Sequence, residues 1–530
     1  MGITRRRFLS GLAVTAAVVG AGCSGSGDDD DDRGGGEGGA GGPGDTTVRH
    51  TARLSGNPFT LGVASGDPLP DSVILWTRLA PQPLVPPAGG MPDDPVDVVW
   101  QVAADDGFRR VAARGVATAQ PGDAHAVHVD PGGLDPVTDY YYRFSVGEWT
   151  SPVGHTRTAP EPGAAVDRLT LAISNCQMFE SGTYGAYRHM LDEDLDFVVH
   201  LGDYIYELDL GRPDRPVAPA GVPVTLDDYR LRYASYRADA DLQAAHARYP
   251  FLCMWDDHEV TNNYAADTVP APDARPETVR AQRAAAYRAY WEHLPVRLAA
   301  PEGPDMTLYR DATFGGLARL YLLDERQYAD EPPCRDAVDG DSGTCAERTT
   351  GDRHYLGAEQ EAWLSDRLDQ GGVTWNLIGN PVVVAGIDAG DASGESYYLE
   401  TWDGYPAARR RFLERLAADD VTNPVVLTGD YHAGMVSDVR LDPEADGAPV
   451  VATELLSPPV SSVLFDADVR GRNPHVQHYL SRHGYLKVTV EPDQLTADFR
   501  ILDDVTDPGT GIATESSWRI AAGAPSATRV

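Results

Sequence analysis

His200-Leu201-Gly202-Asp203-Tyr204-Ile205-Tyr206-Glu207 is the stretch that decides the fold of this chain. It follows a largely apolar run, Leu195 to Val199, that predicts a buried strand ending at the Gly-Asp turn. In α/β folds a carboxylate at the carboxyl end of a strand lies where ligands bind. Tyr206 can join Asp203 on one metal ion, and a phenolate with a carboxylate suits Fe(III) better than zinc. The stretch therefore predicts an α/β fold with a metal site.

Similar polar clusters follow other apolar runs of the chain. They are Trp255-Asp256-Asp257-His258-Glu259 and Thr428-Gly429-Asp430-Tyr431-His432, and Asn380 and Cys176 also stand at predicted strand ends. A twisted sheet can bring these ends to one edge. Together they would suit a dinuclear phosphoesterase, which needs a bridging carboxylate such as Asp203, separate ligands for each ion, and an imidazole or cation near the phosphoryl oxygens. Each cluster alone also has a structural interpretation, because Asp-His pairs often cap helices and Asn-Pro pairs often begin turns.

The composition limits the classes of function. The chain has 530 residues, of which 42% are hydrophobic and 23% charged, and its formal net charge is −36. At about 150 residues per domain this length gives roughly three folded units. An acidic surface repels nucleic acid phosphates, so we expect no nucleic-acid-binding surface. Lys487 is the only lysine, which fits either a GC-rich genome or a saline habitat.

The N-terminal residues predict export by the twin-arginine pathway. Thr4-Arg5-Arg6-Arg7-Phe8-Leu9 precedes an apolar run, Gly11 to Val19, which is too short for a permanent membrane helix of about 20 residues. We interpret residues 1–23 as a signal that the twin-arginine export machinery recognises. The mature protein is therefore expected outside the cytoplasm, and the pathway would carry it already folded with its metal in place.

A lipid anchor is the second expectation for this end of the chain. Ala21-Gly22-Cys23 resembles a lipoprotein cleavage site, although Gly20 stands where an aliphatic residue is usual. A lipid on Cys23 would attach the protein to a membrane, whereas an ordinary cleaved signal would release it. Residues 24–50 contain an aspartate run and many glycines, so they cannot bury enough apolar area to fold and predict a disordered tether.

Two folded domains are expected after the tether. In residues 51–160, short alternating strands separated by Pro, Gly and Asp clusters predict an antiparallel β-sandwich without catalytic residues. In residues 165–510 strands alternate with helices, which predicts an α/β catalytic domain, and residues 511–530 are expected to form a C-terminal tail. The strands predicted in the second domain are 169–174, 195–200, 251–255, 318–324, 375–384 and 425–428, the helices are 226–248, 277–293, 357–368 and 405–418, and 485–490 with 495–502 form a closing hairpin.

The five cysteines have different expected roles. Cys334 and Cys345 flank a loop rich in Gly and Asp, and in an exported protein they predict a disulfide. Cys253 lies in an apolar strand and is interpreted as part of the core. Cys176 follows a strand and enters a loop, so it is either a metal-binding thiolate or a buried structural thiol.

These motifs together resemble the PhoD-like alkaline phosphatases and phosphodiesterases, a family of calcineurin-like metallophosphoesterases. The resemblance extends from the motif Gly62–Pro68 to the final hairpin. The motifs that carry it are Ser174–Gln177, Gly202–Glu207, Trp255–Asn263, Trp402–Pro406 and Gly429–His432. The resemblance implies a four-layer α/β/β/α core, a preceding sandwich of fibronectin type III type, and a site that holds Fe(III) and Ca²⁺.

The resemblance also implies roles for single residues. The iron ligands would be Cys176, Asp203, Tyr206 and His432. The calcium ligands would be Asp203 as the bridge, Asp257, Asn380 and Asp430, with Asp403 holding a further calcium ion. His258 would stand beside the scissile phosphate. Arg326 is either a phosphate clamp or half of a salt bridge with a surface acid.

The implied reaction is hydrolysis of phosphate monoesters, diesters or both by water activated at the metals, with His258 assisting the leaving oxygen. A second enzymatic hypothesis is a phospholipase D-like or wall-polymer phosphodiesterase, which attachment to a surface would suit. A hypothesis from another class is a non-catalytic surface lipoprotein that binds carbohydrate or partners through the sandwich. The acidic clusters at Asp203, Asp257 and Asp430 argue against it, because it gives them no role.

Overall fold

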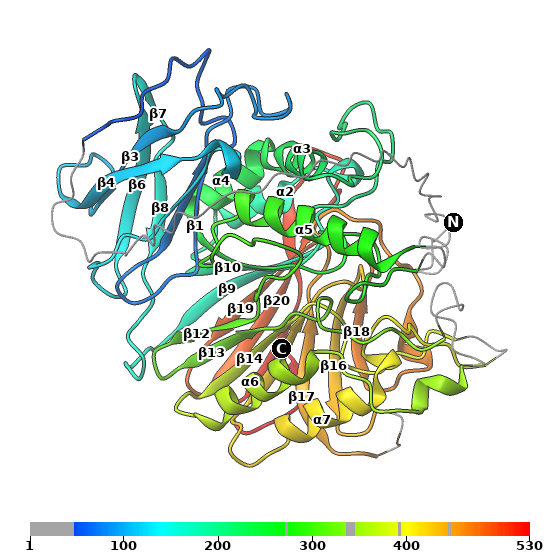
Figure 1. Ribbon diagram of the computed structural model, residues 1–530. Helices are drawn as coiled ribbons and strands as arrows, with labels where there is room; N and C mark the ends of the chain where they lie inside the picture. The colour runs from blue at the N-terminus through cyan, green and yellow to red at the C-terminus, as the bar shows by residue number, and fades with distance from the viewer. Residues whose placement is uncertain (1–46, 271–273, 335–344, 391–393, 444, 446) are drawn as a thin grey trace.

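The computed structural model describes residues 47–270, 274–334, 345–390, 394–443, 445 and 447–530 (Figure 1). The strands of these residues form three sheets. The signal at 1–23 with Cys23, and most of the tether at 24–50, lie outside the described residues. Within them, no helix combines the length and the apolar character that crossing a membrane requires.

The largest sheet has ten strands and includes the C-terminal end of the chain. Its order is β22 (Thr528–Arg529), β21 (Ile512–Ala521), β20 (Gln494–Leu502), β19 (Gly484–Val490), β9 (Leu169–Ser174), β10 (Phe197–Leu201), β11 (Pro250–Met254), β1 (Val63–Gly66), β2 (Ile74–Arg78) and β5 (Ala126–Val129). Strands β9, β10, β11 and β1 run parallel, and the remaining pairs are antiparallel. The predicted hairpin is β19 and β20.

The second sheet has seven strands, and the third has five. The order of the second is β12 (Arg310–Phe314), β13 (Ala318–Leu322), β14 (Trp375–Asn380), β15 (Pro424–Thr428), β17 (Val450–Leu456), β16 (Gly434–Arg440) and β18 (Val476–Leu480). The third contains β4 (Val111–Ala119), β3 (Val96–Ala103), β6 (Asp139–Val146), β7 (Trp149–Thr150) and β8 (Gly154–Arg157). The helices are α2 (Gly185–Met190), α3 (Leu226–Arg237), α4 (Ala240–Arg248), α5 (Pro276–His293), α6 (Gly357–Asp369) and α7 (Pro406–Leu416).

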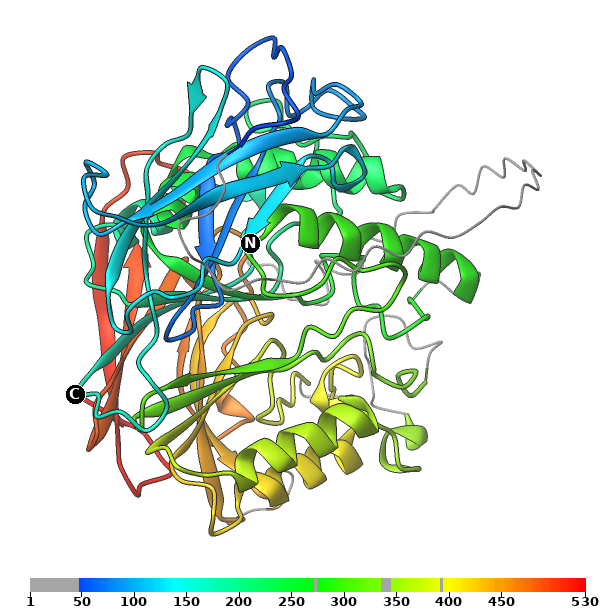
Figure 2. The same ribbon diagram turned by 60° about the vertical axis from the view of Figure 1, so that its left-hand side comes forward.

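The two larger sheets share one apolar core, and helices α6 and α7 pack on the other side of the seven-stranded sheet (Figure 2). Leu377 of β14 lies in the core shared with β9, β10 and β11, whereas the next residue, Ile378, packs against Leu364 of α6 and Phe412 of α7. Strands buried on both faces need apolar residues at successive positions, which is why they appear in the sequence as continuous apolar runs. The fold is a mixed α/β fold, and the facing sheets bring the ends of β9, β10, β11 and β15 together.

The N-terminal region differs from the separate sandwich expected at 51–160. Its strands β1, β2 and β5 belong to the ten-stranded sheet, because β1 pairs in parallel with β11. The five-stranded sheet packs on them through Val98 and Tyr142. Gly66 permits the close approach of β1 to β11, because a Cβ there would lie 2.6 Å from the carbonyl oxygen of Phe251. The two regions therefore share a sheet, and residue 160 does not separate two sheets.

Two further expectations were wrong. Residues 511–530 are not a tail, because β21 pairs along its length with β20 and buries Trp518 and Ile520. Alternation of apolar and polar residues in this segment is the strand signal. The helix expected at 226–248 is two helices. Asp239 caps the start of the second, because its side chain accepts hydrogen bonds from the backbone nitrogens of Asp241 and Leu242.

Candidate metal centre

Four polar residues at the strand ends have left-handed backbone conformations. The φ angles are 50° at Cys176 after β9, 57° at Asp203 after β10, and 58° and 54° at Asp430 and His432 after β15. Non-glycine residues rarely adopt positive φ, and each such residue costs about 1–3 kcal/mol, so these turns persist only where their surroundings fix them. All four side chains are buried. The turns thus direct a thiol, two carboxylates and an imidazole into the protein.

The four expected iron ligands lie together around the Asp203 carboxylate and the Tyr206 hydroxyl. Asp203 Oδ2 accepts hydrogen bonds from the thiol of Cys176 at 3.4 Å and from the hydroxyl of Tyr206 at 2.7 Å. His432 Nε2 lies 3.1 Å from the Tyr206 oxygen, which also accepts a bond from Ser462 at 2.7 Å. The structure therefore brings Cys176, Asp203, Tyr206 and His432 together.

The acidic residues form a second cluster that is continuous with the first. The ligand atoms of Asp203, Asp257 and His258 lie within 4.8 Å of one another, and so do those of Asp256, Asp257 and Asp430. Asp203 thus belongs to both clusters, as a bridging carboxylate must. Asp256 was not expected here. It directly precedes Asp257, and spacing alone does not show which of two adjacent acids faces the site.

Arg326 lies beside this cluster and is 2% exposed. Its Nε donates to Asp256 Oδ1 at 2.5 Å, and its Nη2 lies 3.9 Å from Asp257 Oδ1. The partner is therefore a buried acid, and the expected alternative of a surface salt bridge is wrong. Within the described residues Nη2 makes no hydrogen bond, which leaves one donor of this guanidinium for another group.

His258 is held by two side chains of the first motif. Its Nδ1 lies 2.6 Å from Glu207 Oε2, and its ring stacks on Tyr206 at a centroid distance of 4.2 Å. Burial alone would lower the pKa of His258, but the charges of Glu207, Asp257 and Asp203 raise it well above its usual value. Glu207 was not expected as a functional residue, although it stands four positions after Asp203 in the same motif.

Asn380 and Asp403 have other partners. Asn380 Oδ1 accepts from Trp402 Nε1 at 3.2 Å, and its Nδ2 donates to the carbonyl of Val382. Asp403 forms an ion pair with Arg409 and accepts from the backbone nitrogen of Ile387 at 3.1 Å. Asp403 is absent from the three groups of described residues whose geometry suits a metal. The side chain of Asn380 thus contacts Trp402, and that of Asp403 contacts Arg409.

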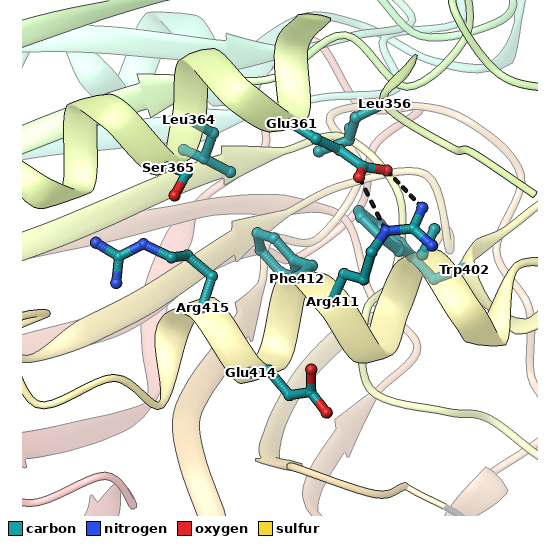
Figure 3. A pocket seen from close by; sticks show the side chains of 10 residues that line it. Leu356, Glu361, Leu364, Ser365, Trp402, Arg411, Phe412, Glu414 and Arg415 are labelled. Atoms are coloured by element: carbon teal, nitrogen blue, oxygen red, sulfur yellow. Dashed lines mark hydrogen bonds and ion pairs between the residues drawn. The ribbon is translucent and has the colours of Figure 1, made fainter. Parts of the chain in front are cut away.

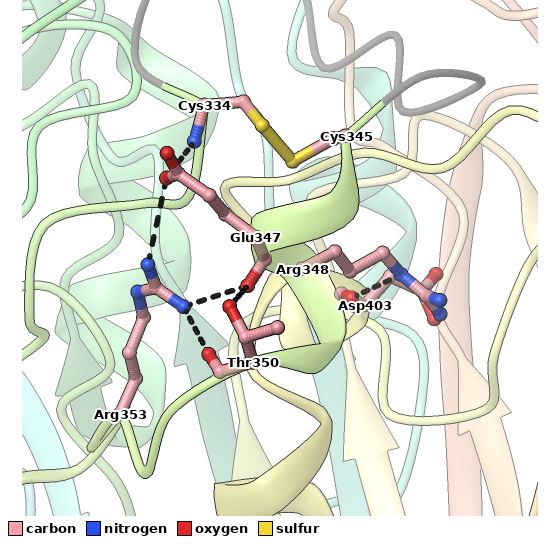
Figure 4. The surroundings of a disulfide bond; sticks show 7 residues. All are labelled: Cys334, Cys345, Glu347, Arg348, Thr350, Arg353 and Asp403. Carbon is pink, nitrogen blue, oxygen red and sulfur yellow. Dashed lines mark hydrogen bonds and ion pairs between the residues drawn. A yellow bond between two sulfur atoms is a disulfide. The ribbon is translucent and has the colours of Figure 1, made fainter.

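The predicted disulfide is confirmed, and it lies close to Asp403 (Figure 4). Cys334 and Cys345 are joined, and a short 3₁₀ helix, Ala346–Thr349, follows the second cysteine. Arg348 of this helix donates from Nε to the Asp403 carbonyl at 2.8 Å. Cys253 is buried in the core, as expected.

A groove of about 380 Å³ lies between α6 and α7 (Figure 3). Trp402 and Phe412 form its apolar floor. Arg411 forms two hydrogen bonds with the Glu361 carboxylate, at 2.8 and 2.9 Å. The residues that line the groove include none of those in the three candidate metal-binding groups. The acidic cluster, not this groove, is the candidate centre.

Comparison with known proteins identifies the family. The model of the PhoD-like phosphatase matches residues 171–499, and the model of the PhoD-like phosphatase N-terminal domain matches residues 45–160. This chain belongs to the PhoD-like phosphatase family. It is 44% identical over 487 residues to alkaline phosphatase D of Bacillus subtilis (strain 168), covering 89% of this chain and 82% of that protein. A solved structure of PhoD matches with a TM-score of 0.85 at 42% identity, covering 91% of this chain and 93% of that one.

As a PhoD-like phosphatase, the protein is a metal-dependent hydrolase of phosphoric esters. The resemblance stated from the motifs is thereby confirmed. The hypothesis of a non-catalytic surface lipoprotein is not supported, because the match covers most of the chain, including the clusters that this hypothesis left without a role.

The residues of the centre fit bound cations. Asp203 Oδ1 and Asp256 Oδ2 are buried and accept no hydrogen bond within the described residues. Burial, with neighbouring carboxylates, raises the pKa of Asp203 well above its usual value despite the opposing charge of His258. Burial raises that of Asp256 to about 8, although Arg326 opposes the shift. Bound multivalent cations would offset the cost of ionising these two buried carboxylates, and this family of phosphatases depends on metals.

Proposed function

We propose that this phosphatase hydrolyses phosphate monoesters, diesters or both at a site with Fe(III) beside Ca²⁺. The observation that carries the proposal is the convergence of a thiol, a phenol and an imidazole on Asp203, next to a purely carboxylate cluster. The first set suits Fe(III), and hard oxygen ligands suit Ca²⁺. The proposed iron ligands are Cys176, Asp203, Tyr206 and His432, and the proposed calcium ligands are Asp203, Asp256, Asp257 and Asp430.

Two expected calcium ligands have a weaker case. The carboxylate of Asp403 could bind a further ion only by giving up its pairing with Arg409. Asn380 could turn its amide oxygen to the site only by releasing Trp402. We therefore restrict the proposed calcium site to the four carboxylates.

The metal ions would supply Lewis acidity, which polarises phosphoryl oxygens and lowers the pKa of water. The chain supplies the rest. Glu207 fixes Nδ1 of His258, so Nε2 is the nitrogen that can donate a hydrogen bond or a proton to the phosphoryl or leaving oxygen. Arg326 favours the ionised form of Asp256 and positions its carboxylate, and its Nη2 can donate to a phosphoryl oxygen.

Metal analysis combined with paired substrates tests this function. The purified protein should contain about one iron and at least one calcium, and should hydrolyse a chromogenic monoester, the matching diester, or both. The ratio of the two rates separates a phosphatase from a phosphodiesterase, and a phospholipid substrate tests the lipase-type alternative. Two zinc ions and no iron, in protein made with its own export signal, would contradict the proposal.

We also propose twin-arginine export and lipid attachment at Cys23. The support is the sequence around Arg5 and Arg6 and the Ala21–Cys23 motif. Replacing both arginines by lysine should stop export. Cys23→Ala should release active enzyme from the membrane fraction. Enzyme that stays membrane-bound after Cys23→Ala would show that the lipid is not the anchor.

We further infer an α/β/β/α order of layers and an N-terminal unit of fibronectin type III type whose strands β1, β2 and β5 are shared with the ten-stranded sheet. The layers are supported by two distinct apolar cores. One lies between the two large sheets, and the other lies between the seven-stranded sheet and helices α6 and α7. The support for the N-terminal unit is a corner in which the Tyr140 hydroxyl accepts from the Asp135 nitrogen at 2.9 Å.

A further inference from the structure

Glu259 is a buried acid that the proposed metal sites do not use. Glu259 is 1% exposed, and its carboxylate accepts three hydrogen bonds from backbone nitrogens. Oε2 accepts from Asp203 at 3.1 Å and from Asp256 at 2.9 Å, and Oε1 accepts from Tyr204 at 2.7 Å. One oxygen atom thus connects the backbone of the proposed bridging ligand to the backbone of the second acidic turn.

These hydrogen bonds begin where the strand pairing ends. Strands β10 and β11 are paired in register up to Leu201 and Met254, and the two turns follow directly. Beyond this point the Glu259 carboxylate joins them. The turns are in close contact, because a Cβ on Gly202 would lie 2.6 Å from the Asp256 nitrogen. Gly202, with φ of 95°, is therefore required for the approach that Glu259 stabilises.

We propose that Glu259 is a positioning residue that fixes the separation between the Asp203 and Asp256–Asp257 carboxylates, and so sets the affinity for the cation between them. A carboxylate can accept from three amide donors at once, and charge makes these hydrogen bonds stronger than neutral ones. A glutamine side chain of the same length has one acceptor oxygen, and its NH₂ group would face a backbone N–H. The identity of the cation, calcium, rests on the proposed function.

The test is Glu259→Gln, with Asp97→Asn as a matched control. Asp97 makes a comparable contact in the N-terminal region, where its carboxylate accepts from the nitrogens of Arg49 at 2.6 Å and His50 at 2.9 Å. Calcium would be titrated into chelated protein by calorimetry, and Tm measured for each. The dissociation constant should rise about 10- to 100-fold in Glu259→Gln, as for other residues that orient metal ligands, and stay unchanged in Asp97→Asn.

A Glu259→Gln protein that binds calcium as tightly as the wild type would overturn the proposal, whatever its Tm. If that variant does not fold, Glu259→Asp keeps the charge on a side chain one methylene shorter, and unchanged affinity there has the same meaning. In chelated wild type, hydrogen exchange should be slow in peptides covering 202–206 and 254–260. Exchange as fast as in exposed loops would also overturn it.

Failure of the proposed function would give a different result. If the wild type holds another cation, metal analysis of the wild type reveals this before any variant is made. The same titration is then run with that cation. The role of Glu259 is judged from the change in dissociation constant between wild type and variant, whichever cation is used, so an error in the identity of the metal and an error in the role of Glu259 remain distinguishable.

Discussion

At the residue scale, Tyr206 links several side chains of the candidate metal centre. It donates to Asp203, accepts from Ser462, lies beside His432 and stacks on His258. Burial, followed by the charge of Asp203, raises its pKa well above the usual value. A phenolate therefore requires a strong cation here, and Fe(III) would supply one.

A phenolate bound to Fe(III) absorbs visible light, so the purified enzyme is expected to be coloured. Tyr206→Phe should remove or shift this absorption, because it removes the phenolate oxygen and keeps the ring. The measurement is an absorption spectrum at matched iron content. Tyr204→Phe is the control, since the Tyr204 hydroxyl contacts His246 at 2.9 Å rather than the proposed iron ligands. An unchanged spectrum in Tyr206→Phe would show that this residue does not bind iron.

His258→Ala should retain both metals while the maximal rate falls by about 10²- to 10⁴-fold with little change in KM, because its proposed role is in the transition state. Asp203→Asn should instead lose metal as well as activity, since Asp203 is the proposed bridge. Metal content and steady-state kinetics on both variants give the answer. Loss of metals from His258→Ala would make His258 a ligand, and normal turnover would make it structural.

The sequence predicts the residues that follow an apolar run, and this explains why Cys176, Asp203, Asp430 and His432 were found. It does not separate neighbouring acids within one motif. The roles of Asp256, Asp257 and Glu259 depend on the direction that the turn gives each side chain, and that direction depends on contacts between two turns distant in sequence. Partners such as Trp402 for Asn380 likewise come from other parts of the chain.

At the element scale, the local pattern of apolar residues predicts where strands lie, whereas pairing between distant segments decides which sheet each strand joins. Strands such as β9 and β15 were expected almost at their observed bounds, because burial on both faces requires continuous apolar residues. The parallel pairing of β1 with β11 joins residues nearly two hundred positions apart. No local signal specifies that partner, so the N-terminal strands were assigned to a separate sandwich.

Removing residues 512–530 should lower Tm and promote aggregation. The truncation exposes the edge of β20, together with the apolar side chains against which Trp518 and Ile520 pack in the full chain. Differential scanning calorimetry and light scattering measure the two effects. Trp518→Ala should destabilise by about 3–5 kcal/mol, as for other large buried aromatic side chains. Removing only the exposed Val530 is the control. A truncated protein that melts like the full chain would mean that β21 adds no stability.

At the scale of the whole molecule, the metal centre joins the two large sheets. Asp203 and Asp257 follow strands of the ten-stranded sheet, whereas Asp430 and His432 follow β15 of the seven-stranded sheet. Cations between them would therefore stabilise the contact between sheets as well as the site. The same carboxylates without cations would repel one another in a chain whose net charge is already −36.

Chelation should accordingly lower Tm of the whole protein in one cooperative transition, and calcium should restore it. A ligand that binds only the folded state adds about 2.7 kcal/mol to the free energy of unfolding at a concentration 100 times its Kd.

Iron bound by Cys176 and Tyr206 should remain during mild chelation, so the colour reports whether that half of the centre is intact. Ionic strength must be matched with a monovalent salt, because an acidic surface responds to any cation. If Tm is unchanged after calcium is fully removed, the two sheets are held by their apolar core alone, and the cation serves only the chemistry.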